Sequence, residues 1–418
     1  MSPVLPFDII ALIIDNVGEN NDTNLLKELA LVSHTFLQIS SKHLFATVEL
    51  HDANPMCHLA SSKKGFVKLL KSKPGVVKFI RKLTYKMENN IYFQSPTNSS
   101  LVNDDHLLSP TLPNFLRTIP RLNCLTINAS RLDWKTMDSS LTSAFLHLMH
   151  LPTINHIDLS FIQNFPLSSL TPSVNLLRLD ISYVYPLEED GSPEFVVQEG
   201  IVPKLREFHT SESPLLTTML LHAKRQDGRP AFNFMDLRRF SMSSIWFEDE
   251  WIIRYVLQNA TLLEEVHLSV GLAQSLVGLH DYLSLSARTL KVLDLTISLH
   301  CGSVPRALAG LCEELEGMAG HTMLEALSFE VQIDGDESED FIGSLFQKVE
   351  VVLVKPGCHW SALRQVSFKV TIACCLVPTE DSAMLCEALQ SLPDKYLSCL
   401  PKLESVAFNF SVYVVKCV

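Results

Sequence analysis

The sequence lacks the features that mark several large classes of protein. It holds no run of about eighteen apolar residues, so we expect no membrane-spanning helix and no membrane partner. Its first residues have no basic start followed by an apolar stretch and a small-residue cleavage site, so no secretory signal is visible. These absences predict a location in the cytoplasm, the nucleus or both.

Metal and redox motifs are also missing. The chain has ten cysteines, most of them after residue 300, and none forms a Cys-x-x-Cys pair. Neither a zinc site nor a redox site is therefore supported, and we expect most cysteines to be buried as small apolar side chains. The stretch from Asp334 to Asp340 is similar to a calcium loop, but Glu339 replaces the required glycine and Leu345 the bidentate glutamate. We expect no metal and no cofactor.

Charge and catalytic motifs exclude two further classes. Charged residues make up only 19% of the chain, and the net charge is −12. Binding to nucleic acid needs clustered cations that face phosphates, so we expect no nucleic-acid partner. His156, Asp158 and Ser160 lie on one face of one predicted strand, where side chains project in parallel and do not converge on a reacting atom. The sequence therefore predicts no enzymatic activity of its own.

Apolar surface, in contrast, is abundant near the start of the chain. Pro6 stands at the first helical position, and Gly18 follows the last apolar residue of the first predicted helix. The apolar residues between them cover an arc of roughly 200°, and those of the segment 24–37 cover roughly 260°. Both arcs are wider than the single stripe that a surface helix needs, so these helices must be covered on two sides.

The same region carries an ordered motif, which reads Leu5-Pro6-x-Asp8-Ile9-Ile10, then Leu29-Ala30-Leu31-Val32-Ser33-x-x-Phe36, then Leu44-Phe45. This order resembles the F-box, a short three-helix domain that docks on the Skp adaptor of cullin–RING ubiquitin ligases. The resemblance implies an F-box over residues 1–50. Phe36 stands where many members of the family carry tryptophan, which keeps the aromatic volume but loses the indole donor. The residues that the resemblance assigns to adaptor binding are Leu5, Pro6, Ile9, Ile13, Val32, Ser33 and Phe36.

A basic segment follows the motif. Nine lysines and arginines, and no acidic residue, lie between Ala53 and Met87. Phe66, Val67 and Leu70 form an apolar stripe on one side of a short helix that ends at Pro74. We predict a basic linker helix within residues 51–75, whose cations form either a solvated face or a patch for an acidic partner.

One apolar pattern recurs over residues 76–418. Each occurrence has apolar residues at its first, fourth and sixth positions. This spacing resembles the leucine-rich repeat, in which each unit supplies one short strand and one return segment, and neighbouring units stack. The eleven triplets are Ile80-Leu83-Tyr85, Leu122-Leu125-Ile127, Ile154-Ile157-Leu159, Val174-Leu177-Leu179, Leu205-Phe208-Thr210, Leu237-Phe240-Met242, Leu263-Val266-Leu268, Leu290-Leu293-Leu295, Leu324-Leu327-Phe329, Leu363-Val366-Phe368 and Leu403-Val406-Phe408.

The repeat is irregular in two ways. The triplets begin 20 to 42 residues apart, which leaves room for helices in segments such as 249–259, 302–318, 338–351 and 382–392. The family's usual asparagine or cysteine, three positions after the last apolar residue, is replaced by residues such as Ser130, Ile162 and Ser182. The predicted fold class is therefore α/β: a three-helix F-box followed by an irregular leucine-rich-repeat solenoid of parallel strands with helical return segments.

The residues between the triplet positions should lie on the opposite face of the strands, which is the concave face of a solenoid and its usual binding surface. The alternative is a solvated sheet face without a ligand. Lys82, Lys86, Asp294, Glu330, Gln365 and Lys369 also fall on this face. Our predicted substrate-binding residues are His156, Asp158, Arg178, Asp180, Glu207, His209, Arg239, Glu265 and His267.

Two functions from different classes follow from these features. The first is the substrate-recognition subunit of an SCF-type cullin–RING ubiquitin ligase, which binds the Skp adaptor through the F-box and a protein substrate through the repeats. The second is a leucine-rich-repeat interaction scaffold outside any ligase, whose amino-terminal helices only cap the repeats. An enzyme is a distant third.

Overall fold

The computed structural model describes residues 6–20, 22–52, 63–87, 111–187, 196–197, 202–225, 227–244, 250–271, 276–299, 310–333, 339–355, 360–374, 386–397, 399–402 and 405–416. Within these ranges the chain is a mixed α/β protein in which parallel strands alternate with helices. This arrangement confirms the α/β class predicted from the sequence. Leu5, the first residue of the predicted adaptor-binding set, and residues 334–338 of the segment similar to a calcium loop lie outside the described residues.

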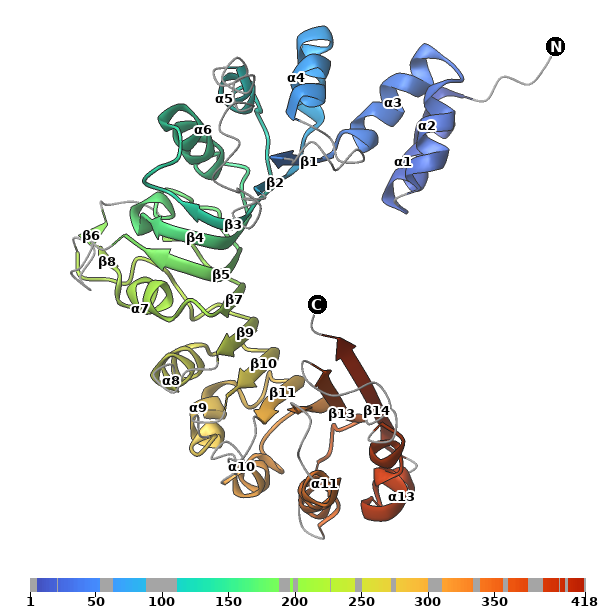
Figure 1. Cartoon of the computed structure of the whole chain (residues 1–418), viewed down its shortest axis with the longest axis vertical. Coiled ribbons are helices and arrows are strands. Elements are labelled where there is room, and N and C mark those ends of the chain that lie inside the picture. The colour runs from blue at the N-terminus through green and yellow to red at the C-terminus, as the bar shows by residue number, and fades with distance from the viewer. Residues whose placement is uncertain are drawn as a thin grey trace, which may run out of the picture. The chain divides into compact units, whose positions relative to one another are not determined.

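The chain divides into two compact units, coloured blue to green and green to red in Figure 1. The first unit comprises Met1–Pro203 and Met219–Phe232, and the second comprises Lys204–Thr218 and Asn233–Val418. In each unit, helices lie along one face of the parallel strands (Figure 1). The helix α7 (Pro214–His222) has residues in both units.

The first unit contains five parallel strands that neighbour one another in chain order. They are β1 (Thr47–Asp52), β2 (Lys82–Met87), β3 (Cys124–Asp133), β4 (His156–Phe165) and β5 (Arg178–Pro186). A separate short pair joins β6 (Val196–Val197) to β8 (Lys224–Arg225). The helices are α1 (Phe7–Glu19), α2 (Thr23–Ala30), α3 (His34–Leu44), α4 (Lys63–Ser72), α5 (Thr111–Leu116) and α6 (Ser139–Met149), with short 3₁₀ turns η1 (Pro74–Phe79) and η4 (Leu167–Ser169).

The second unit contains seven parallel strands, again in chain order. They are β7 (Glu207–Ser211), β9 (Arg239–Ser244), β10 (Glu265–Val270), β11 (Val292–Leu299), β12 (Ala326–Ile333), β13 (Gln365–Cys374) and β14 (Ala407–Lys416). Its further helices are α8 (Glu250–Asn259), α9 (Leu279–Leu283), α10 (Leu311–Met318), α11 (Glu339–Val354) and α13 (Leu392–Tyr396), with η7 (Ser284–Ser286) and η9 (Leu400–Lys402).

The apolar triplets form the cores of the two units. In β4, Ile157 and Leu159 are fully buried, whereas His156 and Asp158, which alternate with them, are only half-buried. This alternation arises because successive side chains of a strand point to opposite faces. Helical side chains pack on the buried face: the ring of Phe145 in α6 lies 5.1 Å from that of Tyr85 in β2.

The predicted register is wrong in two triplets. Ile157 pairs with Leu179 and Leu159 with Ile181, so the fourth triplet is Leu176-Leu179-Ile181 and not Val174-Leu177-Leu179. Leu177 is 37% exposed, which fits a position outside the core. At the end of the chain, Val366 pairs with Phe408 and Phe368 with Phe410, so the last triplet is also shifted by two residues. A shift of two keeps the side chains on the same face, which is why the apolar pattern alone did not exclude it.

The first strand of the sheet was missed. Phe45, Val48 and Leu50 have the same spacing as the other triplets, and Val48 and Leu50 pair with Leu83 and Tyr85 of β2. The predicted border at residue 50 therefore falls inside β1. Only part of the predicted linker helix over 51–75 is described, as α4, and its Phe66, Val67 and Leu70 are buried as the apolar stripe predicted.

The amino-terminal helices α1, α2 and α3 pack on a small core of their own, centred on Ile14, Leu26 and Ile39. The segment 24–37 is not one helix: Ser33 accepts a hydrogen bond from the backbone N–H of Phe36 at 3.3 Å and begins α3 as its N-cap. Gly18 of α1 lies against the ring of His43, where an added Cβ would approach to 2.2 Å. This close approach explains why a glycine stands there.

Candidate functional site

Two surfaces of the protein are candidates for function. The first is a group of exposed apolar side chains on the amino-terminal helices, which we name the helical apolar face. Leu31 is 88% exposed, and Leu12 and Val32 are about two-thirds exposed, at 66% and 65%. The face consists of Phe7, Ile9, Leu12, Ile13, Leu25, Leu31 and Val32.

The structure separates the predicted adaptor-binding residues into two groups. Pro6, Ile9, Ile13 and Val32 are exposed and available to a partner. Ser33 is exposed, but its hydroxyl caps α3, and Phe36 is half-buried against the core of the three helices. The sequence analysis did not single out Phe7, Leu12 and Leu31, although the arc of apolar residues around each helix already included the last two.

An ion-pair cluster joins the first and third helices behind this face. Asp15 of α1 forms an ion pair with Lys42 Nζ at 2.6 Å and a hydrogen bond with His43 Nε2 at 2.7 Å, and both partners lie in α3. Burial alone would raise the pKa of Asp15, but the hydrogen bonds from Lys42 and His43 lower it below its usual value. The cluster fixes α1 against α3 and so holds their exposed apolar residues in place.

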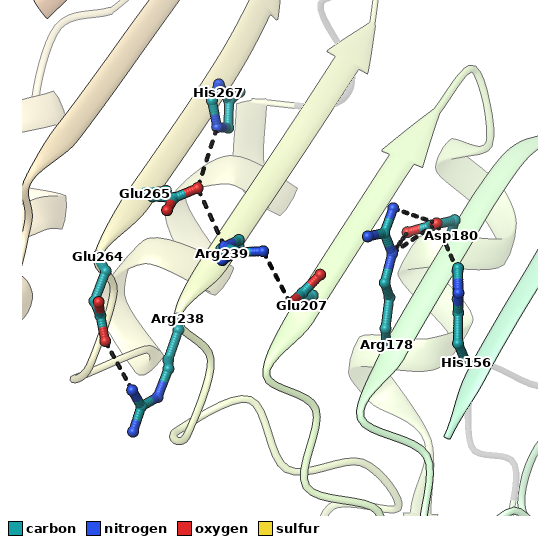
Figure 2. Close-up of polar contacts among 9 residues, drawn as sticks. All are labelled: His156, Arg178, Asp180, Glu207, Arg238, Arg239, Glu264, Glu265 and His267. Carbon is teal, nitrogen blue, oxygen red and sulfur yellow. Dashed lines mark hydrogen bonds and ion pairs between the residues drawn. The ribbon is translucent and has the colours of Figure 1, made fainter. Parts of the chain in front are cut away.

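The second surface is the face of the strands that carries the half-exposed polar residues, which we name the open face. It contains all nine residues predicted for substrate binding. In the first unit, His156 Nε2 lies 2.9 Å from Asp180 Oδ2, and Arg178 contacts the same oxygen at 2.9 Å (Figure 2). Asp158 is half-buried on the same face beside this group. The sequence analysis missed one member, Cys124, whose Sγ lies 3.2 Å from His156 Nδ1.

The pKa values of this cluster follow from burial and from its mixed charges. Burial alone would lower the pKa of His156, but the hydrogen bonds to Asp180 and Cys124 raise it from 6.5 to about 9. Burial would raise the pKa of Asp180, but His156 and Arg178 lower it. For Asp158, burial and then the negative charge of Asp180 raise the pKa, and they outweigh the lowering effect of His156 and of the hydrogen bonds from Thr126 and Ser160. His156 is therefore an imidazolium at neutral pH.

The raised pKa of His156 makes the stability of the protein depend on pH. Because the folded state holds the proton more tightly than the unfolded chain, this contribution is fully present below about pH 6.5 and is lost as the pH rises through 9. We expect the urea midpoint to fall between pH 6.5 and 9, and His156→Gln to reduce that fall. His34→Gln, on an exposed residue of α3, is the matched control. An identical fall in wild type and His156→Gln would contradict the assignment.

In the second unit, the predicted residues form a chain of ion pairs across three strands. Arg239 contacts Glu207 Oε1 at 3.1 Å and Glu265 Oε2 at 3.2 Å, and His267 lies 4.0 Å from Glu265 (Figure 2). His267 Nδ1 also contacts Asp294 Oδ2 at 2.6 Å, and this hydrogen bond raises the pKa of His267 although burial opposes it. His209 is half-buried on the same face of β7, opposite Ser241 of β9.

A hollow of about 220 Å³ lies beside this chain of ion pairs. It is lined by residues of β9, β10, β11 and β12, among them His267, Asp294 and Glu330. The other polar side chains of its lining are hydroxyls: Ser241, Ser243, Ser269, Thr296 and Ser328. The sequence analysis predicted Asp294 and Glu330 for this face but overlooked the hydroxyls, which alternate with buried residues in the same strands.

The described contacts of the open face are mainly pairs of opposite charge. Ser160 Oγ donates to Asp158 Oδ1 at 3.4 Å, and His156 pairs with Asp180 and Cys124, so these described contacts do not form a serine triad. In the described part of the chain, no group of three or more histidine, cysteine, aspartate or glutamate residues could hold a metal ion. The clusters instead place opposite charges in contact, an arrangement that fixes the side chains and presents a patterned polar surface.

Comparison with known proteins does not assign the chain to a family. No protein-family model matches it, and no curated protein is significantly similar to it in sequence. None of the helices in the described ranges is long and apolar enough to cross a membrane.

Proposed function

We propose that this protein is the substrate-recognition subunit of an SCF-type cullin–RING ubiquitin ligase. The helical apolar face would bind the Skp adaptor, and the open face of the strands would bind a protein substrate. In this role the protein performs no bond chemistry. It raises the effective concentration of the substrate near the ubiquitin-transferring enzyme by tethering both in one complex.

The observation that carries the proposal is the helical apolar face. The three helices already have a core, centred on Ile14, Leu26 and Ile39, yet they expose seven large apolar side chains. Several large apolar side chains exposed on a few short helices favour a binding site for a protein partner. The motif that resembles the F-box runs through the same helices, and four of its predicted adaptor-binding residues are exposed: Pro6, Ile9, Ile13 and Val32.

The open face supports the second half of the proposal. Its residues are polar, of both signs and half-exposed, and charge pairs such as Arg178 with Asp180 hold them in fixed positions. A surface held in this way loses little side-chain entropy when a partner binds. The absence of a converging nucleophile, base and acid in these clusters fits a receptor better than an enzyme.

Binding to a purified Skp adaptor tests the proposal. We expect the full-length wild-type protein to bind the adaptor, and Ile9→Asp with Ile13→Asp to weaken binding by at least about a hundredfold, because buried apolar anchors dominate such interfaces. Both residues are more than 40% exposed, so the two changes should leave the fold intact. Calorimetry or surface plasmon resonance measures the affinity.

Leu215→Asp is the matched control. Leu215 is also an exposed aliphatic residue, but it lies in α7, outside the amino-terminal helices. It should bind the adaptor like the wild type. Absence of wild-type binding, or equal binding by the Ile9/Ile13 variant, would overturn the proposal and leave the scaffold function in its place.

A further inference from the structure

The hollow on the open face of the second unit has a simple origin in the sequence. Strand pairing aligns the polar residues that line the hollow in two rows, and each row crosses the strands. One row is Ser241, His267, Asp294 and Ser328, and the next is Ser243, Ser269, Thr296 and Glu330. Since neighbouring strands lie about 4.8 Å apart, three small hydroxyl residues side by side leave a depression that larger side chains would fill.

The depth of the hollow comes from small side chains, and its hydroxyls are free to bind. None of the five lining hydroxyls hydrogen-bonds to another residue within the described ranges. A hydroxyl oxygen can accept a hydrogen bond from an ammonium or guanidinium group. The volume of about 220 Å³ corresponds to about seven water molecules at roughly 30 Å³ each, enough for one long side chain.

The charges of the lining select the sign of the ligand. The hollow is lined by two carboxylates, Asp294 and Glu330, and by no lysine or arginine. Even with His267 protonated, the lining itself has a net charge of about −1, and with His267 neutral about −2, counted from these three groups; Lys369, which pairs with Glu330, lies outside the lining. An anionic ligand would meet both carboxylates at close range. A cation would meet complementary charge.

Both carboxylates are held in place before any ligand arrives. Glu330 accepts hydrogen bonds from Lys369 at 2.9 Å and from Thr371 at 2.8 Å, and Asp294 contacts His267 at 2.6 Å. Burial would raise the pKa of Glu330, but these contacts lower it, so the carboxylate stays ionised. A fixed pair of anions on adjacent strands needs no reorganisation to receive a cation.

We propose that this hollow binds a lysine or arginine side chain of the protein substrate. The stem of the side chain would lie across Ser269 and Thr296, and its charged end would reach Asp294 and Glu330. The proposal rests on the proposed function in one respect, that the open face binds a protein substrate, and it gives that substrate a basic recognition residue. The net charge of −12 favours approach of a basic partner.

Peptide binding to the full-length protein tests this proposal. The probes are fluorescein-labelled peptides of alternating glycine and lysine, with glutamine or glutamate in place of lysine as neutral and acidic controls. Fluorescence anisotropy should show that the lysine peptide binds at least about tenfold more tightly than either control. Asp294→Asn, which keeps the shape, and Ser269→Leu, which fills the hollow, should each weaken binding about tenfold.

Thr84→Leu is the matched control: it makes the same kind of change as Ser269→Leu on the open face of β2, in the first unit. Its affinity for the lysine peptide should equal that of the wild type. Equal binding of lysine and glutamine peptides, absence of binding, or wild-type affinity in Ser269→Leu would each overturn the proposal.

Adaptor binding separates this proposal from the proposed function. Circular dichroism and adaptor affinity are measured on the same variants, and neither should change in Asp294→Asn or Ser269→Leu. A protein that binds the adaptor but not the lysine peptide contradicts only the basic hollow. A protein that binds the peptide through the hollow but not the adaptor contradicts only the ligase function.

Discussion

Replacing Phe368 with alanine is expected to lower the free energy of unfolding by about 3–5 kcal/mol. Phe368 of β13 is fully buried, and its ring contacts those of Phe346 at 4.6 Å, Phe408 at 5.7 Å and Phe329 at 6.0 Å between centroids. These rings come from three neighbouring strands and from α11, so the change opens a cavity where the strands meet their covering helix. Urea denaturation followed by circular dichroism measures the loss.

Phe368→Leu is the first control, because it keeps most of the buried volume and should cost only about 1–2 kcal/mol. Phe161→Ala is the second, because Phe161 is an exposed phenylalanine whose ring stacks on that of Tyr183. Apart from the loss of that stacking, Phe161→Ala should lower the free energy of unfolding by less than about 1 kcal/mol. If Phe368→Ala were as stable as Phe161→Ala, the aromatic cluster could not be the core of the second unit.

The second large effect is expected at Glu350. This glutamate of α11 is 3% exposed, and its Oε1 accepts hydrogen bonds from the backbone N–H groups of Cys399 and Leu400, both at 2.8 Å. Glu350→Ala removes the acceptor of both N–H groups, of which that of Leu400 is buried and that of Cys399 is partly buried. Each lost hydrogen bond costs about 1–3 kcal/mol, so we expect a total loss of about 2–5 kcal/mol. Thermal and urea denaturation measure it.

Glu350→Gln distinguishes this explanation from a simple loss of packing. Its amide oxygen can still accept both hydrogen bonds, so we expect it to retain at least half of the stability that Glu350→Ala loses. Glu387→Ala, on another glutamate in the carboxyl-terminal region, should have little effect, because that residue is exposed. Equal losses from Glu350→Ala and Glu350→Gln would show that the negative charge, and not the acceptor geometry, is what matters.

The periodic apolar triplets predicted the strands well, because burial of alternate side chains is a local requirement that each strand must satisfy. They predicted register less well. The shift between Leu177 and Leu179 leaves the buried face unchanged, so only pairing with Ile157 of the neighbouring strand decides it. The strand at Val48 and Leu50 was missed because the motif that resembles the F-box and the apolar triplet pattern overlap there, and the whole segment was assigned to the motif.

The alternation of side chains along each strand also assigned the polar residues to the open face. It could not predict which of these residues contact one another. Alternation placed His156 and Asp180 on one surface, yet their contact at 2.9 Å depends on the pairing of β4 with β5. Cys124 joined this cluster unpredicted, because cysteine was read as an apolar residue. The hollow could not be predicted from the sequence, since it arises from small residues on four strands that only strand pairing brings together.

For the amino-terminal helices, prediction from the sequence was limited in a different way. Excess apolar surface on residues 5–37 could be counted from the sequence, but the division into buried and exposed members could not. Ile14 and Leu26 are buried, whereas their neighbours Ile13 and Leu25 are exposed. Which of two adjacent apolar residues faces the core depends on how α1, α2 and α3 cross, and the break at Ser33 rotates α3 relative to a continuous helix.

The alignment of open-face residues in rows has a consequence for how such a protein can diversify. The buried triplets keep the strands in register, while each strand contributes one independent position to every row, as Ser243, Ser269 and Thr296 do. A single substitution in a row changes the open face at one point and leaves the core untouched. Duplicated copies of the gene could thus acquire new ligands through a few surface changes, while the selection that maintains folding acts on a separate set of residues.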